Sequence, residues 1–415
     1  MRMLRNCTGI LGGALILPLA LSAQTFTTLY NFGTQAYGAA GVLGGVILGP
    51  QGVLYGIAGG GRWNLGTVYE LLPPSSPAGA WTEVVLHSFS GRQVIPQGGL
   101  AIGPNGSLYG FAESITGGTM AFQLDPPTGA SIDWAYRVIY QFTEADGNPK
   151  CPLVFGSPLG YGQSLYGVAT HVAGNDTVYR LTPPPMAGGA WTNTTLYTFP
   201  GGSKGSGVAG SLAVGTGGAL FGVANGGYIE EMCATNGGCG TVFSLTPPGV
   251  PGGPWTEQVL YSFNPAIGDG YLPNLGVLIG TGGVLYGTTT EAANGGTVYS
   301  LTPPVAPEEP MTATLLHAFT GRGGDGNDPN TILVLGSDGA LHGTTQYGGA
   351  SNDGTVFELA PPASPGGSWT ETILHSFTSF EIEPQGLTLA PGGTIYGTTY
   401  TGGSLNEGTL FAVTP

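Results

Sequence analysis

The sequence is poor in charged residues, and basic residues are the scarcest. Of its 415 residues 8% are charged, and 9 Lys and Arg stand against 24 Asp and Glu, which leaves a net charge of −15. Proteins bind phosphate backbones through clusters of Lys and Arg. We therefore expect no nucleic-acid partner, and we take the acidic balance to favour solubility.

Long apolar runs are also scarce. The run at residues 10–21 follows the basic residues Arg2 and Arg5 and is followed by small residues up to Ala23. This order is typical of an export signal, so we predict a signal peptide over residues 1–23. No later segment approaches the roughly 20 apolar residues of a bilayer span. We expect a secreted, extracellular or cell-surface protein without a transmembrane span, with the periplasm as an alternative.

Cysteine occurs four times, once inside the predicted signal. An oxidising compartment would allow neighbouring cysteines to pair, and Cys233 and Cys239 flank a short Gly-rich segment, so we predict a disulfide between them. A zinc site is not favoured, because no second Cys pair or His stands at ligand spacing. We expect Cys151 to be a free, buried thiol.

Glycine and proline, by contrast, are abundant, with 78 and 33 copies. No Gly-X-Y period is present, which excludes collagen, and 41% hydrophobic residues are too many for a disordered chain. The apolar residues come in short alternating runs bounded by Gly and Pro, the pattern of β-strands. The composition therefore predicts an all-β protein.

One unit of four short strands repeats along the chain. In its fifth copy we predict strands at residues 275–279, 284–287, 296–301 and 311–319, with a Gly-rich turn between the first two. Seven copies of the second strand carry an aromatic residue or its equivalent: Tyr55, Tyr109, Tyr166, Phe221, Tyr286, His342 and Tyr396. Seven copies of the fourth strand carry a phenylalanine: Phe32, Phe89, Phe142, Phe199, Phe263, Phe319 and Phe377.

Seven four-stranded antiparallel units predict a seven-bladed β-propeller, as one domain over residues 24–415. An open β-solenoid is the alternative. The phase of the repeat favours the propeller, because residues 24–32 form a fourth strand without a unit of their own and residues 408–414 form a third strand without a successor. The first segment would complete the last blade and close the ring, which removes exposed sheet edges.

The repeat motifs Leu285-Tyr-Gly-Thr-Thr, Gly295-Gly-Thr-Val-Tyr and Leu301-Thr-Pro-Pro, with the strand Trp255 to Phe263, resemble the GloVer (Gloeo/Verruco) tandem repeat. That family comprises exported bacterial proteins described by their choice of anchor. The resemblance covers essentially all of the chain after residue 23. It implies an extracellular or cell-surface location and identifies no catalytic residues.

Residue types that recur in most blades are interpreted as packing, which removes most Trp and His residues from the candidates. We place any site on the face formed by the variable connections between strands two and three and between blades, around the channel mouth. The remaining candidates for ligand binding are Arg62, Trp63, Tyr228 and Tyr271. The candidates for acid and base catalysis are His171, Glu230 and Glu231.

Asp325 and Asp328 lie in an oxygen-rich Asp-Gly-Asn-Asp segment, which makes them calcium candidates, although we expect neither a metal nor a cofactor. The first hypothesis is a monomeric, exported, non-catalytic propeller that binds a glycan, polymer or protein partner through its loop-rich face. An extracellular polysaccharide lyase or hydrolase is the second. A structural protein of the cell envelope is the third.

Overall fold

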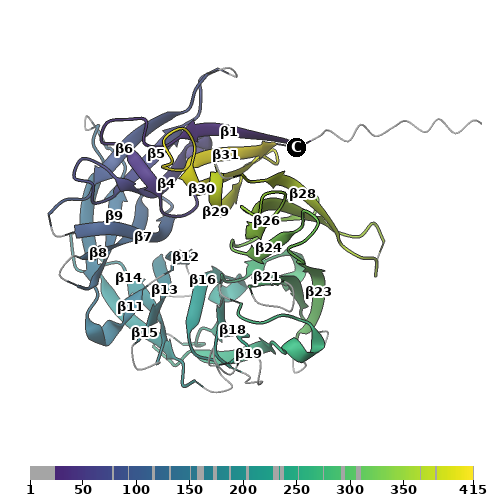
Figure 1. The fold of residues 1–415 in the computed structure, drawn as a ribbon. Coiled ribbons are helices and arrows are strands. Elements are labelled where there is room, and N and C mark those ends of the chain that lie inside the picture. Colours follow the sequence, from purple (N-terminus) through teal and green to yellow (C-terminus); the bar gives the residue numbers. More distant parts are fainter. Residues whose placement is uncertain are drawn as a thin grey trace, which may run out of the picture.

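The computed structural model describes residues 24–414 apart from 77–78, 92, 115–116, 130–131, 150, 157–162, 172–174, 187, 202–204, 228–232, 234–237, 251, 274, 291–294, 305–309, 365 and 379–380. Its strands form seven antiparallel sheets arranged as blades around a common centre (Figure 1). The prediction of a seven-bladed propeller is confirmed, and the solenoid alternative is wrong. None of the helices in the described residues is long and apolar enough to cross a bilayer.

The first three blades follow one another from residue 39 to residue 198. Blade one contains β2 (Ala39–Val42), β3 (Ile47–Leu48), β4 (Leu54–Gly60), β5 (Thr67–Leu72) and β6 (Thr82–Ser88). Blade two contains β7 (Gln93–Ile102), β8 (Leu108–Ser114), β9 (Thr119–Asp125) and β10 (Ala135–Gln141). Blade three contains β11 (Asn148–Pro149), β12 (Val154–Gly156), β13 (Ser164–Thr170), β14 (Thr177–Thr182) and β15 (Thr192–Thr198).

The next three blades repeat the same order. Blade four contains β16 (Val208–Val214), β17 (Leu220–Ala224), β18 (Thr241–Thr246) and β19 (Thr256–Ser262). Blade five contains β20 (Leu278–Ile279), β21 (Leu285–Thr289), β22 (Thr297–Thr302) and β23 (Thr312–Ala318). Blade six contains β24 (Gly326–Pro329), β25 (Val334–Leu335), β26 (Leu341–Gly348), β27 (Thr355–Ala360) and β28 (Thr370–Ser376).

Blade seven joins the two ends of the chain. It contains β29 (Glu381–Leu389), β30 (Ile395–Gly402) and β31 (Thr409–Thr414), with β1 (Thr25–Asn31) as its fourth strand. β1 pairs with β31 from Thr25 opposite Thr414 to Asn31 opposite Thr409, and the purple and yellow strands lie side by side in Figure 1. The N-terminal strand closes the ring, as predicted from the phase of the repeat.

Short 3-10 turns stand in several connections between strands: η1 (Pro50–Gly52), η2 (Glu144–Asp146), η4 (Thr216–Gly218), η6 (Pro265–Ile267) and η7 (Thr281–Gly283).

The core lies between blades rather than within them. The seven clusters of buried hydrophobic residues each combine side chains from two neighbouring blades, and together they cover all seven junctions. The fourth-strand phenylalanines are buried in these clusters, as Phe32 shows by packing 5.1 Å from the ring of Tyr69. Because each sheet buries both faces against its neighbours, no blade is a separate folding unit.

Packing explains the glycine of the Leu-Tyr-Gly motif. Gly287 in β21 lies under the ring of Tyr299 from β22, and a Cβ at residue 287 would meet the Tyr299 hydroxyl. Gly110 lies under Phe122 in the same way in blade two. The aromatic ring of the third strand thus fills the space that the glycine of the second strand leaves.

A bulge recurs in the outer strand. In all seven blades, the pairing of the third and fourth strands shifts register once, for example between Val356 and Phe357 in blade six. The strand pairing skips Leu374 at this point, and His375 is the next residue along the strand. A bulge re-aims the neighbouring side chains, and here it lies beside the column of Tyr and His residues that faces the next blade.

Candidate functional site

Arg62 and Trp63 lie in the turn between β4 and β5. The Arg62 guanidinium stands 5.1 Å from the centre of the Trp63 ring, and Trp63 is 54% exposed. The pair can present a flat cationic and aromatic surface to a partner.

Tyr271 has a different environment. It packs against the core cluster that contains Cys233 and Cys239, which are fully buried and joined in a disulfide with a Cα–Cα distance of 5.1 Å. Tyr228, Glu230 and Glu231 lie outside the described residues. Tyr271 therefore contributes to the packing around the disulfide.

His171 lines a cavity of about 580 Å³ at the junction of blades two and three. Glu113, Glu144 and Thr170 also line it, and it opens on the face predicted for a site, among the connections between strands two and three and between blades. The His171 backbone amide donates to Asp176 at 3.0 Å, and its Nε2 lies 3.5 Å from the Thr177 hydroxyl. His171 is thus held beside the cavity by its own blade.

One small cavity lies among the first strands of the ring. A cavity of about 210 Å³, beside the first strands of blades one, two, three, six and seven, is lined by glycines and aliphatic side chains with Pro152 and Thr388. These lining residues bring no ionisable side chain to the cavity.

Asp325 is held by Thr320. Its Oδ2 accepts hydrogen bonds from the amide of Thr320 at 2.7 Å and from its hydroxyl at 2.6 Å. Asp325 forms one cluster of ionisable groups with His317 and Glu371. Asp328 lies in β24 with a φ of 59° and donates its amide to the Gly295 carbonyl.

An aromatic pair joins neighbouring blades at five junctions. Each pair lies at the end of the blades where the turn between the first and second strands is found. The second-strand tyrosine of one blade meets the tryptophan that precedes the fourth strand of the next, as Tyr286 and Trp369 do at 6.3 Å. The same contact joins Tyr55 to Trp134, Tyr109 to Trp191, Tyr166 to Trp255 and Tyr396 to Trp81. At the junction of blades four and five, Phe221 stands in the tyrosine position and Met311 in the tryptophan position. Both pack against the same hydrophobic cluster.

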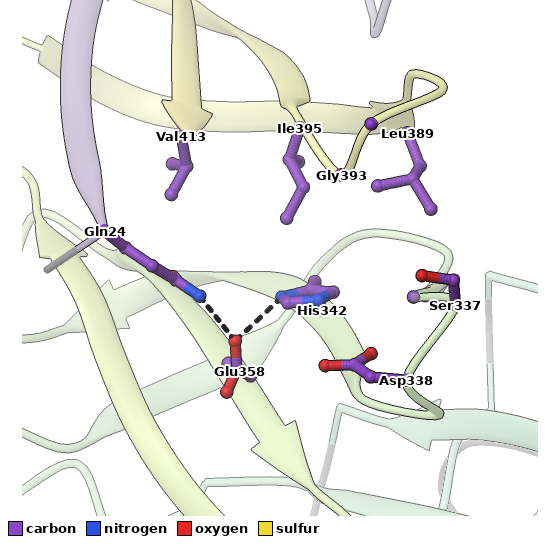
Figure 2. Close-up of a pocket in the computed structure, with 11 residues that line it drawn as sticks. Gln24, Ser337, Asp338, His342, Glu358, Leu389, Gly393, Ile395 and Val413 are labelled. Carbon is purple, nitrogen blue, oxygen red and sulfur yellow. Dashed lines mark hydrogen bonds and ion pairs between the residues drawn. The ribbon is translucent and has the colours of Figure 1, made fainter. Parts of the chain in front are cut away.

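The junction of blades six and seven breaks this rule. His342 stands in the tyrosine position and Gln24, eight residues before Phe32, stands in the tryptophan position. Both aromatic rings are replaced by smaller polar groups, and a cavity of about 380 Å³ opens here (Figure 2). We call this cavity the junction pocket.

Polar groups converge on one side of the junction pocket. The Gln24 side-chain amide donates to Glu358 Oε2 at 2.8 Å, and His342 Nδ1 lies 3.8 Å from the same oxygen. His342 is 6% exposed, and its Nδ1 is buried without a hydrogen bond. Burial lowers the pKa of His342, against the opposing effect of the Glu358 and Asp338 carboxylates, so the imidazole is neutral at pH 7.

The opposite side of the junction pocket is apolar. Leu389, Ile395 and Val413 of blade seven face the Glu358 and His342 side chains across the cavity (Figure 2). Two tight turns complete the rim, at residues 336–338 and 392–393. The lining contains carboxylates and no Lys or Arg, so the pocket favours a neutral or cationic ligand over an anion.

The sequence matches a known protein family. A family model described as the Gloeobacter/Verrucomicrobia repeat matches residues 157–411. The chain belongs to this family. The region that matches the Gloeobacter/Verrucomicrobia repeat includes His342 and Glu358, while Gln24 comes from the strand that closes the ring. No curated protein matches the sequence.

Several solved structures resemble this Gloeobacter/Verrucomicrobia repeat protein in fold. The periplasmic gluconolactonase of Pseudomonas aeruginosa aligns at 15% identity over 84% of this chain and 92% of its own, with a TM-score of 0.49. The β-propeller domain of Cps50 (Swd1) from Myceliophthora thermophila aligns at 10% identity over 94% and 100%, with a TM-score of 0.48. At these identities their activities are not transferred to this chain.

The junction pocket was not among the sequence predictions. His342 occupies the position of the second-strand tyrosines and Gln24 the position of the tryptophans, so neither residue differs from its repeat in spacing. The sequence does contain a sign of the pocket. His342 is the polar exception among the second-strand aromatic residues, and Gln24 is the polar exception at the tryptophan position. The pocket also opens near the first turns, on the face opposite to the one chosen for its variable loops.

Proposed function

We propose that this protein is an exported, ligand-binding propeller whose junction pocket holds one sugar unit of a neutral glycan. The observation that carries the proposal is the double exception at one junction, where His342 and Gln24 replace an aromatic pair and leave a cavity. Packing alone favours the aromatic pair at this position, because five other junctions contain it.

The two sides of the junction pocket suit a sugar ring. Carboxylates accept hydrogen bonds from sugar hydroxyls, and side-chain amides can both donate to them and accept from them. Aliphatic side chains pack against the C–H faces of the ring. Its volume of about 380 Å³ lies within the range of roughly 300–1,000 Å³ usual for small-molecule sites. The carboxylates of Asp338 and Glu358, without a basic neighbour in the lining, disfavour acidic sugars.

A polysaccharide hydrolase or lyase is the second candidate function. The observation that favours it is the neutral imidazole of His342 beside the Glu358 carboxylate, with Asp338 in the same pocket. A neutral imidazole and a carboxylate are both side chains that can act as a general base, and such chemistry needs a base positioned in the cavity. Release of reducing ends from a glycan that binds, abolished by Glu358→Gln, would support catalysis over binding alone.

A glycan array with the purified protein tests the proposal. We expect the wild type to bind neutral glycans, and we expect His342→Tyr to lose this binding because the phenol fills the cavity. The double variant His342→Tyr/Gln24→Trp rebuilds the pair seen at five junctions and should fold normally. Trp63→Ala is the control on the opposite face. Binding that survives in the double variant, or is lost only in Trp63→Ala, would contradict the proposal.

A further inference from the structure

A second column of contacts joins the blades along their outer strands. The Tyr or His of one fourth strand meets the second residue of the next fourth strand. Tyr30 donates to Glu83 at 3.0 Å, and His87 stacks on Tyr136 with ring centres 4.0 Å apart. His375 stacks on Phe26 at 3.5 Å. Each of these junctions is closed by a hydrogen bond or a ring stack.

The connection between blades adds an aspartate to this column at three junctions. Between blades two and three, Asp146 Oδ1 accepts from Tyr140 at 3.2 Å and from the Asn193 amide at 2.9 Å. Asp269 accepts from Tyr261 between blades four and five. At both places, hydrogen-bond donors meet the carboxylate.

The junction of blades five and six has the aspartate without those donors. His317 replaces the tyrosine, Glu371 replaces the asparagine, and Asp325 is the carboxylate. His317 Nε2 lies 3.5 Å from Asp325 Oδ1 and 3.6 Å from Glu371 Oε2. His317 Nε2, Asp325 Oδ1 and Glu371 Oε1 are buried and have no hydrogen-bond partner.

These separations are too long for direct bonds and suit a shared ion. A charge-assisted N–H···O bond spans about 2.7–2.9 Å. Tetrahedral ligands about 2.1 Å from a zinc ion lie about 3.4 Å from one another. One ligand atom from each of the three residues can be chosen so that all lie within 4.8 Å of one another. The three side chains therefore stand near the spacing of metal ligands.

We propose that His317, Asp325 and Glu371 bind one divalent transition-metal ion, with Zn²⁺ as the best fit. An imidazole nitrogen with two carboxylates is a zinc-type donor set, whereas calcium takes oxygen ligands. The two hydrogen bonds from Thr320 hold Asp325 Oδ2 and leave Oδ1 for the ion, as outer partners of metal ligands do. The ion would tie β23 to β28.

The site lies just below the surface. The side chains of His317, Asp325 and Glu371 are 15–20% exposed although the ligand atoms themselves are buried, so a side-chain movement would admit an ion without unfolding of the blades. Three protein ligands leave a fourth tetrahedral position for water. The predicted stoichiometry is one ion for each chain.

Calorimetric titration of Zn²⁺ into the full protein, after treatment with EDTA, tests the proposal. The matched variant is His317→Tyr/Glu371→Asn, which recreates the Tyr140, Asn193 and Asp146 arrangement of another junction and should fold. We expect one ion bound by the wild type and an affinity more than about 100-fold weaker in the variant, since even outer partners of metal ligands change affinity 10–100-fold.

The control is His375→Tyr, at the same position of the next blade, which should bind Zn²⁺ like the wild type. Asp325→Asn provides a second ligand variant if the double variant is poorly folded. A folded wild type that binds no Zn²⁺, or a folded double variant that binds it with unchanged affinity, would overturn the proposal. A shift in melting temperature with Zn²⁺ should appear in the wild type and the control, and be absent from the double variant.

Discussion

His87 of blade one stacks on Tyr136 of blade two, with ring centres 4.0 Å apart and planes inclined by 7°. Its Nε2 is buried without a hydrogen bond, and burial lowers the pKa of His87 to about 4. A neutral imidazole therefore forms part of the seam between two blades.

This seam predicts a pH dependence of stability. The pKa of His87 is near 6.5 in the unfolded chain, so between pH 6.5 and 4 the unfolded chain takes up a proton that the folded protein does not. The contribution of His87 is complete above pH 6.5 and is lost as the pH falls towards 4. After a discount for partial exposure, the loss is on the order of 1–2 kcal/mol.

The variant His87→Phe keeps the ring and removes the proton site. Its free energy of unfolding, measured by denaturant titration at pH 7 and pH 4.5, should fall less than that of the wild type. Equal falls in both proteins would show that His87 does not contribute to acid sensitivity. Other titrating groups are common to both proteins and cancel in the comparison.

The closing strand gives a second prediction. Deletion of residues 24–32 removes β1, exposes the edge of β31 and removes the buried Phe32 ring. We expect severe destabilisation or aggregation, whereas deletion of residues 1–23 alone should leave the melting temperature unchanged. A stable and cooperative 33–415 fragment would contradict ring closure by this strand.

The small disulfide gives a third prediction. Cys233 and Cys239 are fully buried and close a loop with a sequence separation of 6. A loop of this size is worth about 2 kcal/mol through the entropy of the unfolded chain. The variant Cys233→Ala/Cys239→Ala should lose about that much free energy of unfolding, and dithiothreitol should destabilise the wild type but not the variant. Equal stability of the variant and the oxidised wild type would refute this contribution.

The glycine under the third-strand ring gives a fourth prediction. Gly287→Ala brings a methyl group against Tyr299 and should cost about 1–3 kcal/mol through overpacking. Gly249→Ala is the matched control, because a Cβ there meets nothing within 4 Å. Thermal or chemical denaturation should separate the two variants. Similar stabilities would mean that the glycine of the Leu-Tyr-Gly motif is not required for packing.

Much of the fold follows from local signals. The Leu-Tyr-Gly strands, the Gly-rich turns and the Pro-Pro strand ends recur in every copy or most copies, and the split of one copy between the two termini indicates a ring. Packing residues such as Trp369 could be separated from site candidates because they recur at the same position of most blades.

The junction pocket could not be located in this way, because the contacts that define it join different blades. Trp369 meets Tyr286 of the preceding blade, and Gln24 reaches His342 only through the closure of the ring. Which columns meet depends on the stagger of adjacent blades, a three-dimensional property that no single repeat encodes. A comparison of paired columns, rather than of single columns, reveals the exception.

The junction pocket is proposed to hold a neutral sugar unit. A crystal structure of the protein soaked with a neutral oligosaccharide selected on the array tests it most directly. We expect density for one sugar unit between the Glu358 carboxylate and the Ile395 and Val413 side chains, with a hydroxyl hydrogen-bonded to Glu358 or His342. Density for the oligosaccharide beside Trp63 or His171, with the junction pocket filled by water alone, would show that the sugar site lies elsewhere.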